Sequence, residues 1–224
     1  MKKKILFVVT SHSEKGNTGK KTGYFLSEVS HPWKVLTQAG YEIDFVSPKG
    51  GNPPVDGFDL NDPVNKEFWE NPVYNNKISH SLQPSQVNTE DYDAIYYAGG
   101  HGAMWDLPDN KDIARITSKI YENNGIVAAV CHGPAGLINV KLDNGSYLLN
   151  GKKVSGFTNE EEDKVGLTKV VPFLLEDKMK ERGAIFEKAD PWKVQAVSDQ
   201  RLITGQNPQS ATRVGEMIKE ALKN

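Results

Sequence analysis

The single cysteine of the 224-residue chain, Cys131, lies between an apolar run and a glycine-rich turn. Residues 126–130 (IVAAV) are continuously apolar, which is typical of a central strand covered on both faces. Gly133 and Gly136 permit close backbone approach, and Pro134 suits the first turn of a helix. A strand that turns sharply into a helix exposes the side chain at the turn, as in a nucleophile elbow, and the helix N-terminus favours a thiolate. The pattern predicts a nucleophilic cysteine; the alternative is a small buried hydrophobic residue.

A pair of glycines follows a second predicted strand, residues 95–98. Open α/β sheets bind ligands at the carboxyl ends of their strands, and both this pair and Cys131 fall there. Gly99 and Gly100 can present bare N–H groups to an anion or a developing oxyanion, although a tight turn alone would also favour glycine. His101, next in the chain, could face the same pocket or belong to the loop, and we favour the loop.

Glutamates at two places in the chain could exchange protons or orient a base. Glu28 sits among apolar residues just before a proline. A surface position is usual for a glutamate, but a carboxyl group in an apolar cleft has a raised pKa and can donate or accept protons. Glutamates 160–162 follow a predicted strand at residues 154–157. Acidic residues in a first helical turn are usually solvated partners of the helix dipole, yet one of them could orient a histidine at the elbow.

Other kinds of site are weakly represented. Residues 14–23 hint at a phosphate loop, but the P-loop has four residues between its glycines and two separate Gly16 from Gly19. The five histidines form no HExxH pattern and there is no CxxC, so we predict no metal site. A net charge of −2 favours neither nucleic acid nor an anionic membrane as a partner.

The elements that must hold these residues alternate along the chain. Strands that alternate with amphipathic helices predict an α/β fold with a mostly parallel sheet and helices on both faces. Residues 195–204 contain two short runs joined by a polar turn, which predicts a hairpin added to that sheet. The predicted strands span 5–9, 43–46, 95–97, 126–130, 154–157, 194–197 and 202–204, and the predicted helices span 33–39, 110–123 and 210–223.

The length of the chain suits one large α/β domain. Residues 49–93 interrupt the alternation with many Pro, Asn, Gly and Asp residues and a short helical piece at 63–70 that carries Phe68 and Trp69. We expect a lid or rim insertion, whose aromatic residues either cover a site or pack onto the sheet. A single cysteine forms no internal disulfide, and no segment approaches the ~20 apolar residues of a membrane span, so we expect a cytoplasmic protein.

In this order the motifs resemble those of the ThiJ/PfpI superfamily. Within it the chain is most similar to the heat-shock-protein-31-like branch of glutathione-independent glyoxalases (glyoxalase III). The resemblance implies a flavodoxin-like α/β sandwich, a single ThiJ/PfpI-like (class I glutamine amidotransferase-like) domain over residues 1–224, and a homodimer. The matching segments are 21–24 leading to Glu28, 31–32, 99–102, 128–134, 156–161, 191–192 and 204–210.

The resemblance also implies roles for single residues. Cys131 matches the nucleophile, Glu28 the acid beside it and His132 the triad histidine. Glu162 best matches the third member of the triad, with Glu161 as the alternative because the register in a run of glutamates is ambiguous.

Backbone groups have matches as well. Gly100 and the N–H of His132 match the oxyanion hole, with Gly99 beside them at the substrate-binding turn. Because adjacent side chains diverge at an elbow, we expect Glu28 to carry most of the proton transfer.

The activity implied is that of a glyoxalase III type hydro-lyase (D-lactate dehydratase). A Cys131 thiolate would convert methylglyoxal or a related 2-oxoaldehyde to a 2-hydroxy acid such as lactate, with no cofactor and no metal. Alternatives within the superfamily are a stress-response holdase chaperone, a deglycase and a redox sensor that works through oxidation of Cys131. A protease and an FMN-binding flavodoxin are less favoured.

Overall fold

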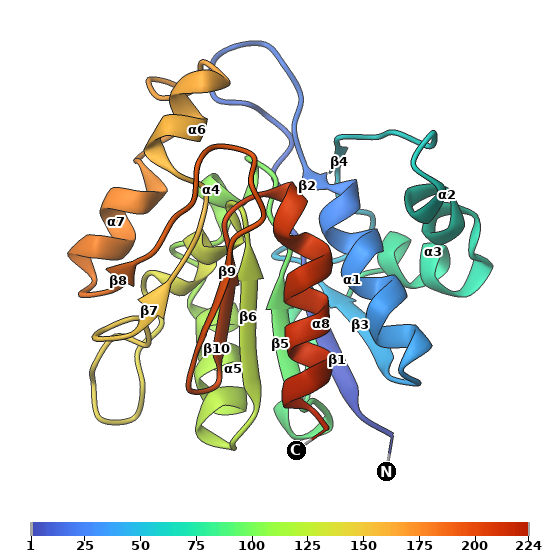
Figure 1. The fold of residues 1–224 in the computed structure, drawn as a ribbon. Helices are drawn as coiled ribbons and strands as arrows, with labels where there is room; N and C mark the ends of the chain where they lie inside the picture. Colours follow the sequence, from blue (N-terminus) through green and yellow to red (C-terminus); the bar gives the residue numbers. More distant parts are fainter. Residues whose placement is uncertain (1, 224) are drawn as a thin grey trace.

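The structure, a computed structural model, describes residues 2–223. Within them the central sheet has six strands in the order β3-β1-β5-β6-β10-β9 (Figure 1). Neighbouring strands are parallel except at one edge, where β9 and β10 pair antiparallel as a hairpin. This confirms the predicted α/β fold with a mostly parallel sheet and an added hairpin. The strands are β1 (Lys4–Val8), β3 (Glu42–Val46), β5 (Ala94–Tyr97), β6 (Ile126–Val130), β9 (Ala196–Asp199) and β10 (Leu202–Gly205).

Helices cover both faces of this sheet (Figure 1). α1 (Leu26–Gln38) and α8 (Ala211–Ala221) pack against each other on one face, and α5 (Lys111–Glu122) lies on the other. Every residue of β6 is buried because both of its faces are covered, as the apolar run predicted. The helices predicted at 110–123 and 210–223 are confirmed, with ends that differ by one or two residues.

α1 begins at Leu26, earlier than the predicted start at residue 33, and it runs through Pro32. A proline inside a helix cannot donate to the carbonyl four residues before it, which here belongs to Glu28. The hydroxyl group of Tyr96 in β5 donates to that carbonyl instead, at 2.6 Å. The side-chain bond replaces the missing helical one and ties the backbone of Glu28 to the sheet.

Two predicted elements differ in the structure. β7 comprises Lys153–Val154 alone and pairs with β8 (Ile185–Phe186) in a separate sheet, so the strand predicted to reach residue 157 is wrong beyond Val154. The N–H of Ser155 instead donates to the Thr204 side chain at 2.8 Å, which takes residues 155–157 out of strand pairing and toward α6 (Asn159–Lys164). The segment after Cys131 is a 3₁₀ helix, η3 (Gly133–Leu137), and not an α-helix.

Residues 49–93 form a layer beside α1 and β3, with an edge at the site. α2 (Pro63–Glu70) packs on α1, and Phe68 is fully buried with its ring edge-on to Trp33 and Phe45. The aromatic residue therefore packs into the core, which was one of the two expected outcomes. Asp56 and Asp62 are the residues of this segment that line the main cavity.

The other elements are short. They are β2 (Tyr24–Phe25), β4 (Val55–Asp56), α3 (Pro72–Ser79), η1 (Pro84–Gln86), η2 (Thr89–Asp91), α4 (Ala103–Asp106), α7 (Leu175–Glu181) and η4 (Pro208–Ser210). Among the described residues, no helix combines the length and apolar character that crossing a membrane requires.

Candidate active site

Cys131 occupies a strained turn at the carboxyl end of β6. Its φ angle of 59° lies in the left-handed region, which costs a residue with a side chain about 1–2 kcal/mol and is common at functional sites. Its N–H donates to the carbonyl of Gly205 at 3.0 Å and its carbonyl accepts from Phe157 at 2.9 Å, so neighbouring segments hold the turn on both sides. The side chain lines the cavity but is only 4% exposed, so the prediction of an exposed thiol is wrong: the sulfur lies at the bottom of a pocket.

Glu28 lies beside this thiol and is completely buried in the first turn of α1. Its Oε2 accepts a hydrogen bond from the N–H of Gly99 at 2.5 Å, and its Oε1 has no hydrogen-bond partner among the described residues. The thiol of Cys131 is close enough to act on the pKa of this carboxyl group. Burial raises the pKa of Glu28 to about 8, against the opposing effects of the Cys131 thiol and the Gly99 N–H. The carboxyl group therefore holds its proton at neutral pH, as a proton donor requires.

Simultaneous ionisation of the Cys131 thiol and the Glu28 carboxyl group is unfavourable because they are neighbours in a buried site. Burial, followed by the neighbouring Glu28, raises the pKa of the Cys131 thiol, which corrects the expectation that a helix terminus lowers it. The helix concerned is a 3₁₀ helix of five residues and supplies little dipole. Two adjacent negative charges are unfavourable in a buried site, so a Cys131 thiolate is compatible with a protonated Glu28 and not with an ionised one.

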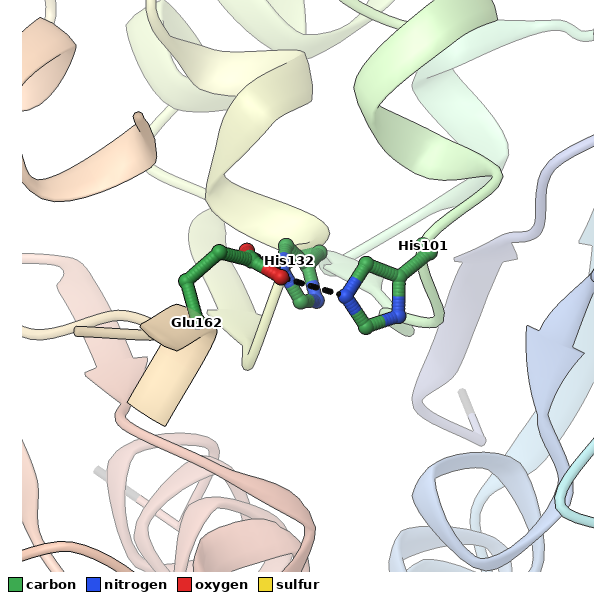
Figure 2. Close-up of side chains that lie close together, drawn as sticks. All are labelled: His101, His132 and Glu162. Carbon is green, nitrogen blue, oxygen red and sulfur yellow. Dashed lines mark hydrogen bonds and ion pairs between the residues drawn. The ribbon is translucent and has the colours of Figure 1, made fainter. Parts of the chain in front are cut away.

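On its other side Cys131 faces a histidine and a glutamate. Nδ1 of His132 lies 3.5 Å from Sγ of Cys131, and its Nε2 lies 2.7 Å from Oε2 of Glu162 (Figure 2). Burial opposes ionisation of Glu162, but the charges and hydrogen bonds of His132 and His101 outweigh it and lower its pKa to about 2. An ionised carboxylate requires the proton on Nε2, so in the neutral tautomer of this ring the lone pair lies at Nδ1, the atom next to the thiol. The expected divergence of the two adjacent side chains is therefore wrong.

His101 belongs to the same group of side chains. Its Nε2 lies 2.7 Å from Oε1 of Glu162, its ring is 4.1 Å from that of His132, and it lines the cavity (Figure 2). Burial, reinforced by His132, lowers the pKa of His101 to about 4, so the ring is neutral at pH 7. His101 does lie in the turn between β5 and α4, but its side chain lines the cavity, so the preference for a loop histidine outside the pocket is wrong. The available signal was its place in the turn that follows β5, the strand that pairs with β6.

The two glycines after β5 have different tasks. The N–H of Gly99 is bonded to Glu28 and is not free for an oxyanion, which corrects its predicted role. A side chain at Gly99 would also collide with the Glu28 carboxyl group at 2.5 Å. Gly100 has a φ of +100°, and a side chain there would meet the carbonyl of Gly23 at 2.1 Å. The N–H groups of Gly100 and His132 are left as the candidate oxyanion donors.

Glu161 lies apart from the histidines although it is adjacent to Glu162. Its buried carboxylate accepts hydrogen bonds from the side chains of Thr158, Gln206 and Asn207 and from the backbone of Trp192. These hydrogen bonds tie α6 to Trp192 and to residues 206–207. The family-like segments at 191–192 and 204–210 therefore have a structural role here, which is to hold Glu161. The register ambiguity is thereby resolved in geometry, because Glu162 is the glutamate that contacts His132.

The cavity has a volume of about 680 Å³, several times that of a three-carbon aldehyde. Its lining includes the aromatic residues Phe25, Phe157 and Trp192. Its charged lining residues are of both signs: Lys15, Lys20, Asp56 and Asp62. Among residues 2–223, His101, His132 and Glu162 form the group that could hold a metal ion, with ligand atoms within 4.8 Å of one another. In this structure both Nε2 atoms are already hydrogen-bonded to the carboxylate.

The fold and the site together define a class: an α/β domain with a cysteine at a nucleophile elbow, a buried protonated carboxyl group on one side and a His–Glu pair on the other. The chain belongs to the DJ-1/PfpI family, whose model matches residues 21–221. The resemblance seen in the motifs is therefore confirmed.

Relatives match the chain over almost its whole length. Glyoxalase 3 of Candida albicans is 34% identical over 98% of both chains, and the glutathione-independent glyoxalase HSP31 of Saccharomyces cerevisiae is 35% identical over 99% of both. Among solved structures, Rapid Encystment Protein 24 kDa of Francisella tularensis has a TM-score of 0.95 and 45% identity, covering 99% of this chain and 100% of that one. Glyoxalase III of Candida albicans has a TM-score of 0.91 and 33% identity, covering 98% and 97%.

Proposed function

We propose that this protein is a glutathione-independent glyoxalase that converts methylglyoxal, or a related 2-oxoaldehyde, to the 2-hydroxy acid. The observation that carries the proposal is the placement of the Cys131 thiol at the bottom of a cavity, between a carboxyl group that is protonated at neutral pH and the lone pair of His132. The names and near-complete coverage of the relatives support it.

The reaction begins with addition of the thiolate to the aldehyde carbon. The His132 lone pair accepts the thiol proton, the sulfur bonds to the carbon, and the oxygen of the resulting hemithioacetal is stabilised by the N–H groups of Gly100 and His132. Glu28 can then protonate that oxygen. No external oxidant or glutathione is needed up to this point, because the thiol of the protein itself forms the adduct.

The next step moves hydrogen from one substrate carbon to its neighbour. A base, Glu28 or His132, removes the proton from the former aldehyde carbon, and the enediol that results takes a proton at the adjacent carbon. One carbon is oxidised to a thioester and its neighbour is reduced to an alcohol, so the change is internally balanced. Water then hydrolyses the thioester and releases the 2-hydroxy acid and the thiol.

The test is a lactate assay with methylglyoxal and purified protein in the absence of glutathione. Cys131→Ala is expected to lower product formation by at least about 10³-fold, because it removes the atom that forms the adduct. Its melting temperature checks the fold, and His80→Gln, at a position outside the cavity, is the matched control. Product formation that survives in the alanine variant would overturn the mechanism. The homodimer and the cytoplasmic location stay predictions.

A further inference from the structure

His101 and His31 both line the cavity, but their ring nitrogens are engaged differently. Nδ1 of His31 lies 3.1 Å from the hydroxyl of Thr212 and Nε2 lies 2.7 Å from Asp62, so both nitrogens of that ring have protein partners. His101 has one partner, Glu162, at Nε2. Figure 2 shows the other ring nitrogen of His101 on the side away from Glu162. Among residues 2–223 that atom, Nδ1, has no hydrogen-bond partner.

The Glu162 carboxylate thus serves two histidines in the same way. Oε2 accepts from Nε2 of His132 and Oε1 accepts from Nε2 of His101, each at 2.7 Å. In both rings the proton is held at Nε2 and the lone pair is left at Nδ1. The two lone pairs have different surroundings: that of His132 faces Cys131, while His101 makes no hydrogen bond to the thiol within the described residues.

We propose that His101 is a second base of the site and that it activates the water that hydrolyses the Cys131 thioester. The proposal rests on the proposed glyoxalase function and assigns its last step. His132 is adjacent in sequence to the acylated cysteine, and its Nδ1 lies against the sulfur that becomes part of the thioester. The ring centroid of His101 lies 4.1 Å from that of His132, and His101 lines the same cavity as Cys131, so a water molecule in that cavity can contact Nδ1 of His101 and reach an acyl group on Sγ.

The step balances without a further reactant. The oxygen of water bonds to the thioester carbonyl carbon while one of its protons passes to Nδ1 of His101. The carbonyl oxygen takes the negative charge and is stabilised by the N–H groups of Gly100 and His132. Collapse of this intermediate breaks the carbon–sulfur bond, releases the 2-hydroxy acid and returns Cys131 as the thiolate. The proton on His101 then leaves to solvent through the cavity.

The chain offers a variant that separates catalysis from positioning. A glutamine at position 101 places an amide N–H near the position of Nε2 and can keep the hydrogen bond to Glu162, but it has no base at the position of Nδ1. His101→Gln is therefore expected to form the thioester at close to the wild-type rate and to hydrolyse it about 10²-fold more slowly or worse. The experiment mixes enzyme with methylglyoxal, quenches at timed intervals and measures the acylated protein by intact mass spectrometry alongside released lactate.

Three comparisons decide the result. His101→Gln should accumulate protein acylated at Cys131. Hydroxylamine, added after excess methylglyoxal has been removed, attacks a thioester without a base and should release the acyl group as a hydroxamic acid, returning the free thiol. His31→Gln should not accumulate acyl-enzyme, because both of its ring nitrogens are engaged elsewhere.

Two outcomes would overturn the role of His101: lactate release at the wild-type rate in H101Q, or loss of acylation together with turnover. Absence of lactate from the wild-type protein would instead overturn the glyoxalase function itself. If H101Q fails to fold, slower deacylation of the wild-type acyl-enzyme in D₂O is the second measurement, and an unchanged rate contradicts the proposal.

Discussion

Glu28 lies beside Cys131 and Glu162 lies beyond His132, the histidine next to that cysteine; both glutamates are almost fully buried, yet their pKa values are shifted in opposite directions. Glu28 has one hydrogen-bond donor, the Gly99 N–H, and a neighbouring thiol, so burial dominates and its pKa rises to about 8. Glu162 has two imidazoles, which outweigh burial and bring its pKa to about 2. Burial alone therefore does not determine the charge of a carboxyl group; the donors supplied by the neighbouring elements do.

The division of labour follows from this difference. A neutral carboxylic acid can donate a proton to a developing oxyanion or a hydrogen bond to a thiolate, and an ionised carboxylate can hold imidazole rings in one tautomer. Placing the first on α1 and the second on α6 puts the thiol between a proton donor and a proton acceptor. The site obtains acid and base functions at one pH from two residues of the same type.

Of the changes that test this difference between the two carboxyl groups, the largest effect is expected from removing the exchangeable proton of Glu28. Glu28→Gln preserves the shape and the acceptor for Gly99 but cannot transfer a proton, so turnover of methylglyoxal should fall by about 10²–10⁴-fold. The Cys131 thiol should still react with iodoacetamide at pH 7 at the wild-type rate or faster, because the wild-type carboxyl group is already neutral there. If alkylation and turnover fell in parallel, Glu28 would be acting on the thiol and not on the substrate.

The alternation of strands and helices allowed the sheet, the hairpin and the elbow to be predicted, because each depends on local apolar patterning and on glycine or proline at a turn. The first half of α1 was missed because Pro32 interrupts the helical pattern, and the hydroxyl that compensates comes from Tyr96, sixty-four residues later in the chain. The placement of His101 in the site and the state of the Cys131 thiol were missed for the same reason. Both depend on side chains that tertiary packing brings together, namely Glu162 and Glu28.

The pH dependence of stability provides a second test of the difference between the two carboxyl groups. A pKa raised from 4.5 to about 8 means that the stabilisation associated with Glu28 is fully present below pH 4.5 and is lost as the pH rises through 8. A pKa lowered from 4.5 to about 2 means that the stabilisation associated with Glu162 is present above pH 4.5 and is lost as the pH falls through 2. Each group contributes a slope of up to about 1.4 kcal/mol per pH unit within its window.

Urea unfolding at a series of pH values measures both windows. Glu28→Gln should flatten the decline between pH 4.5 and 8 and leave the acid side unchanged, whereas Glu162→Gln should flatten the acid side. The same decline on the alkaline side in wild type and E28Q would mean that another group, and not this carboxyl, titrates there.

The smallest effect on turnover is expected from removing the hydrogen bond by which Tyr96 of β5 ties the backbone of Glu28 to the sheet. Tyr96→Phe removes the hydroxyl that donates to the Glu28 carbonyl and leaves that buried acceptor unpaired, because Pro32 has no N–H to offer. The free energy of unfolding should fall by about 1–3 kcal/mol, and turnover should change by a few-fold at most because the Glu28 side chain keeps its bond to Gly99. Tyr97→Phe is the matched control, since the hydroxyl of Tyr97 pairs with Thr117 of α5 on the opposite face of the sheet. Urea unfolding of both variants measures the free energy of unfolding, and the lactate assay measures turnover. Equal effects of Y96F and Y97F on turnover would show that the bond from Tyr96 to the Glu28 backbone has no specific influence on the Glu28 carboxyl group.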